Sequence, residues 1–179
     1  SKIFITNSAT PMTLGSTLQV ISGEKNGKPE FTTFLMENDA EGFTQEPMDR
    51  KMMWRASNTG KLTFNNVRLP KENMLGEAGQ GSHIMLSTLD GGRLSIAAMG
   101  LGCAQGAYEM ALAYSQKREQ FGKPVCKFQA VSFKLADMAM KMEAARCLLY
   151  KACRIKDAGM PFGKEAAMAK LYCSEVAAE

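Results

Sequence analysis

The sequence has almost none of the residue patterns that hold a metal ion. Histidine occurs once, at His83, and the five cysteines form no C-x-x-C pair and have no histidine beside them. A zinc site is therefore not expected, and a catalytic triad would have only one candidate base. An odd number of scattered cysteines instead predicts reduced thiols in a reducing compartment.

Long apolar runs and strong charge are lacking too. No segment is apolar enough over a sufficient length to span a bilayer, and no signal peptide is visible. The net charge of +4 is spread along the 179 residues, which permits a polyanionic ligand without indicating nucleic acid. Ser1 is followed at once by an apolar run, and the last residues are helical in pattern without a capping signal. We therefore expect a piece of a longer protein.

The first part of the chain predicts short β-strands. An Asn26-Gly27 pair between two of them is a strong hairpin signal. Several short strands before any helix favour part of a barrel or sandwich over a parallel sheet with crossover helices. The segments rich in β-branched and aromatic residues are Ile3–Thr6, Leu18–Ile21, Phe31–Met36, Gly42–Gln45 and Lys61–Pro70.

The second part predicts helices joined by short loops, as in an antiparallel bundle. A long helix is expected from about Gly81 to Lys123, a second from about Lys127 to Asp157, and a third from near Lys164. The second carries a regular apolar stripe, and Gly159 follows it as a stop signal. Residues spaced to share one face of the first helix are Ile96, Gly100, Cys103, Ala107, Met110 and Tyr114.

The long helix has a polar motif at each end, Leu89–Arg93 and Lys117–Pro124. Arg93 and Arg118 are 25 residues apart, which corresponds to about 37 Å of helix. One small-molecule site cannot use both arginines, so the helix is expected to serve two places. Asp90 and Arg93 are spaced for an i,i+3 ion pair that needs no functional explanation.

Two further features could contact a flat, charged ligand. Arg118 could pair with a phosphate, with Gln120 and Phe121 beside it at the helix end. Phe4 and Thr6 alternate on a strand and should point to the same side, which suits a flat cofactor but is more often plain barrel packing. From the residues alone, the sequence predicts an α+β protein with two candidate anion sites.

Five motifs taken together resemble the acyl-CoA dehydrogenase family, in that family's order and spacing over essentially the whole chain. They are Lys2–Asn7, Arg55–Thr59, Val67–Gly76, Leu89–Arg93 and Arg118–Pro124, the last followed by Phe128–Ala130.

The resemblance implies an α+β fold class, with the end of a middle β-barrel-like domain at 1–78. The first part of an antiparallel C-terminal helical bundle would follow at 79–179. It implies an FAD-dependent enzyme of fatty acid β-oxidation that introduces an α,β double bond into an acyl-CoA. The electrons would pass to electron-transferring flavoprotein. A homo-oligomer, a dimer or tetramer, is expected. So is a location in the bacterial cytoplasm, or in the mitochondrial matrix for a eukaryotic source.

The resemblance also assigns roles to individual residues. Thr6 would contact the flavin near N5, and Phe4 would line its ring, where the family often has Trp. Asp90 and Arg93 would face the acyl-CoA. The residues that would reach the pyrophosphate and adenosine half of an FAD held mainly by a neighbouring subunit are Arg118, Gln120, Phe121 and Gln129.

The sequence departs from the family pattern at two places. Some members place the catalytic glutamate where this chain has Gly92, so the resemblance is to the branch whose glutamate follows residue 179. Neither Glu175 nor Glu179 sits in that motif, and the isolated piece is expected to be inactive. Met53-Trp54 stands where the family usually has Gly and a small or medium residue, which leaves the role of Trp54 open.

The resemblance is strongest to short-chain, butyryl-CoA-like members through Thr88–Arg93 and Lys164–Leu171. Two alternatives share the fold. An acyl-CoA oxidase or flavin monooxygenase would let its reduced flavin reoxidise rapidly in air. A catalytically dead binding subunit would lack the downstream glutamate in the parent gene.

Overall fold

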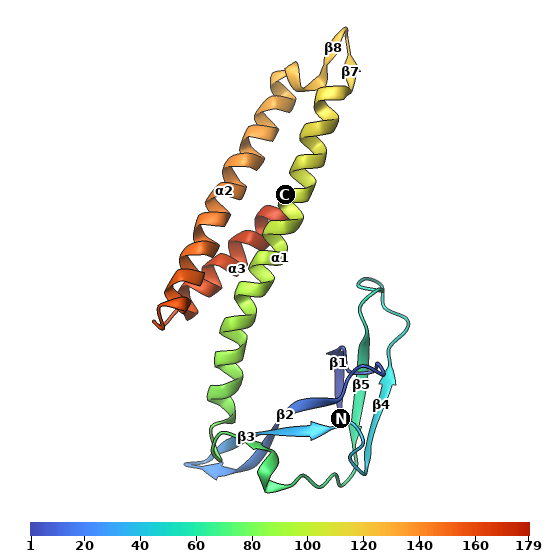
Figure 1. Ribbon diagram of the computed structural model, residues 1–179, viewed down its shortest axis with the longest axis vertical. Helices are drawn as coiled ribbons and strands as arrows, with labels where there is room; N and C mark the ends of the chain where they lie inside the picture. Colours follow the sequence, from blue (N-terminus) through green and yellow to red (C-terminus); the bar gives the residue numbers. More distant parts are fainter. The chain divides into compact units, whose positions relative to one another are not determined.

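The computed structural model describes residues 1–179 and divides them into two compact units, Ser1–Met85 and Leu86–Glu179 (Figure 1). The first unit holds two β-sheets and the second is mainly helical, as the sequence predicts. One long helix, α1, begins at the end of the first unit and continues into the second. No helix is both long and apolar enough to cross a membrane.

The strands of the first unit form two separate three-stranded antiparallel sheets, ordered β1-β5-β4 and β2-β3-β6. The absence of parallel pairing agrees with the prediction, but no closed barrel is present, so the barrel-like description goes too far for these residues. The strands are β1 (Lys2–Thr6), β2 (Gly15–Lys25), β3 (Lys28–Glu37), β4 (Phe43–Pro47), β5 (Thr59–Phe64) and β6 (Met74–Leu75), with a short 3-10 helix η1 (Lys71–Asn73) before the last.

The predicted hairpin is confirmed at the turn between β2 and β3. Asn26 and Gly27 both have positive φ, 53° and 72°, the conformation that two-residue hairpin turns favour because it matches the strand twist. Lys25 therefore pairs with Lys28 directly across the turn. Strand β5 ends at Phe64, six residues before the predicted end at Pro70, where Asn66 takes a positive φ of 52°.

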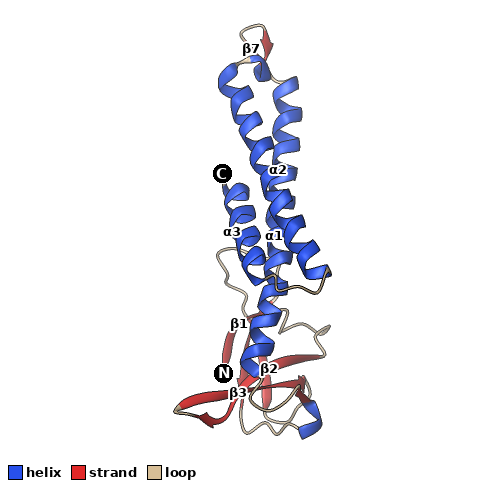
Figure 2. Ribbon diagram, turned by 90° about the vertical axis from the view of Figure 1, so that its left-hand side faces the viewer, coloured by secondary structure: helices blue, strands red, loops and turns tan.

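Three helices make up most of the second unit, and Figure 2 shows α3 beside the part of α1 and α2 that is remote from the β7–β8 turn. The prediction that the first helix runs to Lys123 is wrong for its last residues. Phe121 and Gly122 have positive φ values of 52° and 76°, which a right-handed helix cannot contain. The elements are α1 (Gly81–Lys117), β7 (Glu119–Gln120), β8 (Lys123–Pro124), η2 (Val125–Lys127), α2 (Gln129–Asp157) and α3 (Gly163–Ala178).

The helices meet in one core made largely of small side chains. The predicted α2 stripe is confirmed, with Met142, Ala145 and Leu149 buried. The α1 face that carries Met110 and Tyr114 does not enter the core, and both residues are exposed, because leucine and alanine positions offset from that face pack against α2 and α3. The α1 residues in the core are Leu94, Ala97, Leu101 and Ala104.

Glycine allows one close approach between helices. A Cβ on Gly100 would lie 3.0 Å from the carbonyl oxygen of Cys173, so the backbone of α3 passes directly over this point of α1. Gly100 therefore permits a close approach that a larger residue would block. At Gly102 and Gly106 a Cβ would meet nothing within 4 Å.

We expect the five thiols to react with iodoacetamide in an order set by burial. Cys103 and Cys147 are exposed, whereas Cys173 is fully buried and burial raises the pKa of its thiol. The thiolate is the reactive species, so Cys173 should be labelled last. Its extent of labelling should reach that of the other thiols only in denaturant. Mass spectrometry of timed samples measures the order; early labelling of Cys173 would contradict this packing of α3.

Candidate functional site

The short β7–β8 hairpin gathers four of the predicted cofactor residues at the tip where α1 passes into α2. Arg118 directly follows α1, Gln120 ends β7, and Gln129 is the first residue of α2. Phe121 occupies the turn and is 92% exposed. The backbone N–H of Val125 donates to the Arg118 carbonyl at 2.8 Å, which ties the hairpin back to the helix end.

The hairpin tip has the physical properties of an anion-binding surface. Helix α2 begins after Phe128 with no side-chain cap and no acidic residue in its first turn, so the N–H groups of Gln129 and Ala130 have no side-chain acceptor and the positive dipole end suits a negative group. The Lys123 Nζ lies 4.5 Å from the centre of the Phe128 ring, and the Phe121 ring meets Phe128 edge-on at 6.2 Å. The tip therefore offers Arg118 and an uncapped helix N-terminus, which can contact a negative group, and an exposed aromatic ring, which can pack on a flat one.

Asp90 and Arg93 lie far from the hairpin along α1 and form the predicted ion pair. Both side chains are partly exposed. Asp90 also lies beside the start of α3, because a Cβ on Gly163 would be 2.9 Å from its Oδ2 atom. Phe162 provides no side-chain cap there, so the Asp90 carboxylate supplies the negative charge that a helix N-terminus favours. Spacing in sequence predicts the ion pair but not this contact.

Phe4 and Thr6 lie on β1, and both are exposed. The pairing of β1 with β5 shifts register between Lys2 and Ile5, and Phe4 has a positive φ of 63°. A β-bulge of this kind re-aims a side chain, so simple alternation does not place Phe4 and Thr6 on one side of the strand. A non-glycine residue at positive φ is uncommon and concentrates at functional sites.

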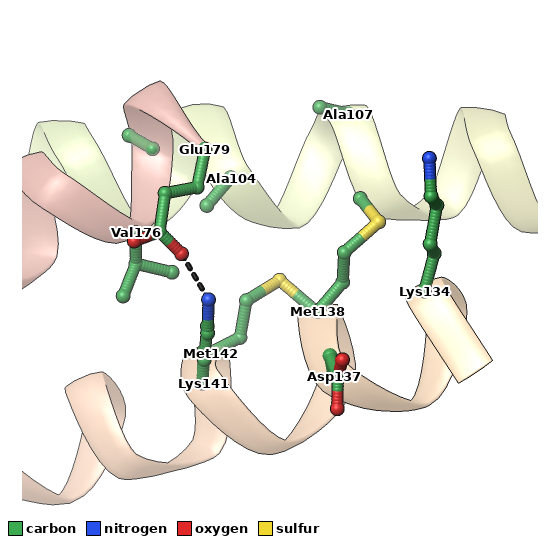
Figure 3. Close-up of a pocket in the computed structure, with 10 residues that line it drawn as sticks. Ala104, Ala107, Lys134, Asp137, Met138, Lys141, Met142, Val176 and Glu179 are labelled. Atoms are coloured by element: carbon green, nitrogen blue, oxygen red, sulfur yellow. Dashed lines mark hydrogen bonds and ion pairs between the residues drawn. The ribbon is translucent and has the colours of Figure 1, made fainter.

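The structure thus groups the predicted residues into three places: β1, the Asp90–Arg93 pair, and the hairpin tip. A further groove, of about 330 Å³, lies between the helices and contains none of them (Figure 3). Its lining residues are Ala104, Ala107, Lys134, Asp137, Met138, Lys141, Met142, Val176, Ala177 and Glu179.

The groove has an apolar interior and a charged rim. Met138 and Met142 extend from α2, while Lys141 pairs with Glu179 at the end of α3. The hydrogen bond and the charge of Glu179 raise the pKa of Lys141 above its ordinary 10.5. The pair is therefore intact at neutral pH, and it weakens as the pH rises through that raised pKa. The partners are 38 residues apart, so no local sequence pattern predicts them.

The chain matches known proteins over almost its full length. Residues 79–179 match the family model "Acyl-CoA dehydrogenase, C-terminal domain". The short-chain specific acyl-CoA dehydrogenase of Megasphaera elsdenii is 47% identical over 177 residues, which is 99% of this chain and 46% of the relative. The solved structure of butyryl-CoA dehydrogenase from the same organism has a TM-score of 0.90 at 46% identity, covering 98% of this chain and 45% of that one.

A second solved structure carries the description "Electron transferring flavoprotein of Acidaminococcus fermentans: Towards a mechanism of flavin-based electron bifurcation". Its matching chain is 42% identical to this one, with a TM-score of 0.89, and the match covers 98% of this chain and 46% of that chain. The chain thus spans about half the length of the relatives it matches. A family model that covers more than half of the chain, together with identity of this level, establishes that the chain belongs to the acyl-CoA dehydrogenase family.

Proposed function

We propose that this chain is part of an FAD-dependent dehydrogenase that introduces an α,β double bond into a short-chain acyl-CoA. The observation that carries the proposal is the 47% identity, over 99% of the chain, to a short-chain specific acyl-CoA dehydrogenase. Residues 1–78 would belong to the middle β domain and residues 79–179 to the C-terminal helical domain. The enzyme would act in fatty acid β-oxidation, in a bacterial cytoplasm or a mitochondrial matrix.

The hairpin tip fits the nucleotide half of FAD. Arg118 would pair with the pyrophosphate in the forked geometry that guanidinium groups offer to phosphate. Gln120 and Gln129 would add hydrogen bonds, and Phe121 would pack on a flat ring. Since these side chains lie at the exposed end of the helical unit, the FAD they contact would be held mainly by a neighbouring subunit, so the active form would be a homo-oligomer, a dimer or tetramer.

The remaining site residues would serve the flavin ring and the substrate. When bound, FAD accepts the hydride that leaves the substrate β carbon. Thr6 would donate a hydrogen bond near flavin N5, and Phe4 would line the ring. Arg93, whose guanidinium is oriented by Asp90, would attract the negatively charged CoA portion of the substrate.

A glutamate would remove the α proton, and we place it outside residues 1–179. Position 92 is glycine and cannot act as a base. Glu179 already forms an ion pair with Lys141 of α2. Electrons would pass to electron-transferring flavoprotein, as the description of the Acidaminococcus fermentans structure suggests.

The experiment that tests this function uses the full-length protein purified with its flavin. Under anaerobic conditions, butyryl-CoA should bleach the flavin absorbance promptly, because the flavin becomes reduced as the substrate is oxidised. A series of saturated acyl-CoA thioesters should give the fastest bleaching with short chains. Flavin that stays oxidised with every thioester would contradict the proposal and leave the dead-subunit alternative. Rapid reoxidation in air would favour an oxygen-using relative.

A further inference from the structure

Asp90 lies on the face of α1 that enters the helical core. The residues that α1 buries there follow one another at steps of three and four: Leu94, Ala97, Leu101 and Ala104. Asp90 precedes Leu94 by four residues, so it continues the same face of the helix. Its side chain is only 31% exposed, and a carboxylate in such a place needs groups that offset its charge.

Helix α3 meets this face of α1 at two points in a single register. A Cβ on Gly100 would lie 3.0 Å from the carbonyl oxygen of Cys173, and a Cβ on Gly163 would lie 2.9 Å from Oδ2 of Asp90. The two contacts are the same number of residues apart on both helices, so α3 runs parallel to α1 between them. The first residue of α3 is therefore packed against the Asp90 carboxylate.

The carboxylate explains why α3 begins with glycine. The backbone of Gly163 is outside the left-handed region, and alanine is the stronger helix former, so the backbone itself does not require glycine. A Cβ at this position would be 2.9 Å from Oδ2 and 3.4 Å from Oδ1 of Asp90. Because the clash is with the end of a side chain, an alanine here would displace the carboxylate and leave the helix intact.

Asp90 contacts Arg93 as well as the start of α3. Its Oδ1 accepts a hydrogen bond from Arg93 Nη1, while Oδ2 is the oxygen nearest to the Cβ position of Gly163. Helix α3 has no side-chain cap, so its positive end offsets part of the carboxylate charge. Arg93 is thereby oriented without being fully neutralised. Its side chain is 40% exposed, and its other N–H groups can meet a ligand.

We propose that Gly163 and Asp90 are positioning residues for the acyl-CoA substrate. Gly163 leaves room for the Asp90 carboxylate, and the carboxylate holds the Arg93 guanidinium where it can pair with a phosphate of the CoA portion. The inference rests on the proposed function, in which Arg93 attracts that portion. Asp90 then acts through Arg93 and not by touching the substrate, and the start of α3 helps to set the affinity for substrate.

The test measures anaerobic flavin bleaching in the full-length holoenzyme at varied concentrations of butyryl-CoA. Gly163→Ala should raise the half-saturating concentration about tenfold, the effect of losing one hydrogen bond to a charged group. The limiting rate and the FAD content should stay unchanged, because the lost contact is equally strong before and during the reaction. With butyryl-pantetheine, which carries the same thioester without the phosphates, the half-saturating concentration should not change.

A double variant tests whether the two residues act as one unit. Asp90→Ala alone should also raise the half-saturating concentration about tenfold, since Arg93 loses its orienting partner. Adding Gly163→Ala to it should cause no further rise, because no carboxylate remains to be displaced. If Gly163→Ala alone does not fold, the double variant should fold for the same reason, and failure of both to fold overturns the inference.

Two matched controls separate this role from general effects. Gly102→Ala makes the same substitution in α1, where a Cβ would meet nothing within 4 Å. Glu165→Gln removes another negative charge from the first turn of α3, but Glu165 is not the ion-pair partner of Arg93. Both variants should keep the half-saturating concentration of the wild type. A rise in Glu165→Gln as large as in Asp90→Ala would mean that only the charge at the helix start matters, and it overturns the inference.

The remaining outcomes are also decisive. An unchanged half-saturating concentration in Gly163→Ala overturns the positioning role, as does an equal rise with butyryl-pantetheine, which would indicate a general distortion of the site. A lowered value in Asp90→Ala overturns it too, because Asp90 would then only repel the phosphates. In each of these cases the proposed function stands. A wild type whose flavin stays oxidised with every thioester contradicts the proposed function, and the inference fails with it.

Discussion

Replacing Leu149 with alanine is expected to lower the free energy of unfolding of the helical unit by about 3 kcal/mol. Leu149 is 4% exposed and lies in the core shared by α1, α2 and α3. The neighbouring core residues are mostly alanines, whose side chains are too short to fill the space that the leucine leaves. The loss therefore includes a cavity in addition to the lost transfer free energy.

Urea unfolding followed by helical circular dichroism measures this loss in the purified protein. The matched control is Leu171→Ala on α3, where the leucine is 58% exposed; its unfolding free energy should change by no more than about 0.5 kcal/mol. Equal losses in the two variants would mean that the three helices do not share the core described above. A change in the slope of the transition would instead point to an altered denatured state.

The sequence predicts elements well where the signal is local. The Asn26-Gly27 turn lies at the predicted hairpin, because the positive φ that such a turn needs is a property of those two residues. The α2 stripe is likewise read from helical spacing alone. Both signals depend on residues close together in the chain, so tertiary structure does not change them.

Predictions that depend on packing were less successful. The face of α1 that enters the core contains Ala97 and Ala104, whereas the more apolar Met110 and Tyr114 are exposed. Periodicity identifies a possible face, but the partner helices select the one whose small side chains let them approach. The end of α1 also differs from the prediction. Phe121 has a positive φ, and phenylalanine is not a residue type from which that conformation can be predicted.

The residues of the candidate site also divide into those whose contacts follow from local spacing and those whose contacts depend on packing. The Asp90–Arg93 ion pair follows from spacing, but the contact of Asp90 with the start of α3 depends on a helix more than seventy residues later in the chain. Arg118, Gln120 and Phe121 follow one another closely enough for the sequence to group them, whereas Gln129 joins this group only through the resemblance to a family. The bulge at Phe4 was not predicted, because nothing in the local sequence marks the register shift.

Replacing Arg118 with alanine is expected to weaken FAD binding by about 10- to 100-fold, since a hydrogen bond to a charged group contributes about 1.5–3 kcal/mol. Arg118 directly follows α1 at the hairpin tip, and Phe121 in the turn of the same hairpin is exposed. Arg118 is the only side chain at this tip that can donate two parallel hydrogen bonds to a pyrophosphate, and the substitution removes it. Arg118→Lys should recover part of the affinity, because it keeps the charge but not the fork.

Titration of the flavin-free oligomer with FAD, followed by flavin fluorescence, measures these affinities. Lys117→Ala is the control: it removes the same charge one residue earlier, at the end of α1. Size-exclusion chromatography of each variant shows whether the oligomer is retained, which matters because the FAD is proposed to lie between subunits. If Lys117→Ala weakens binding as much as Arg118→Ala, the effect is general electrostatic attraction and the specific role of Arg118 is wrong. If only Arg118→Ala weakens binding, α1 ends in a cofactor contact remote from Arg93, and one helix serves two sites.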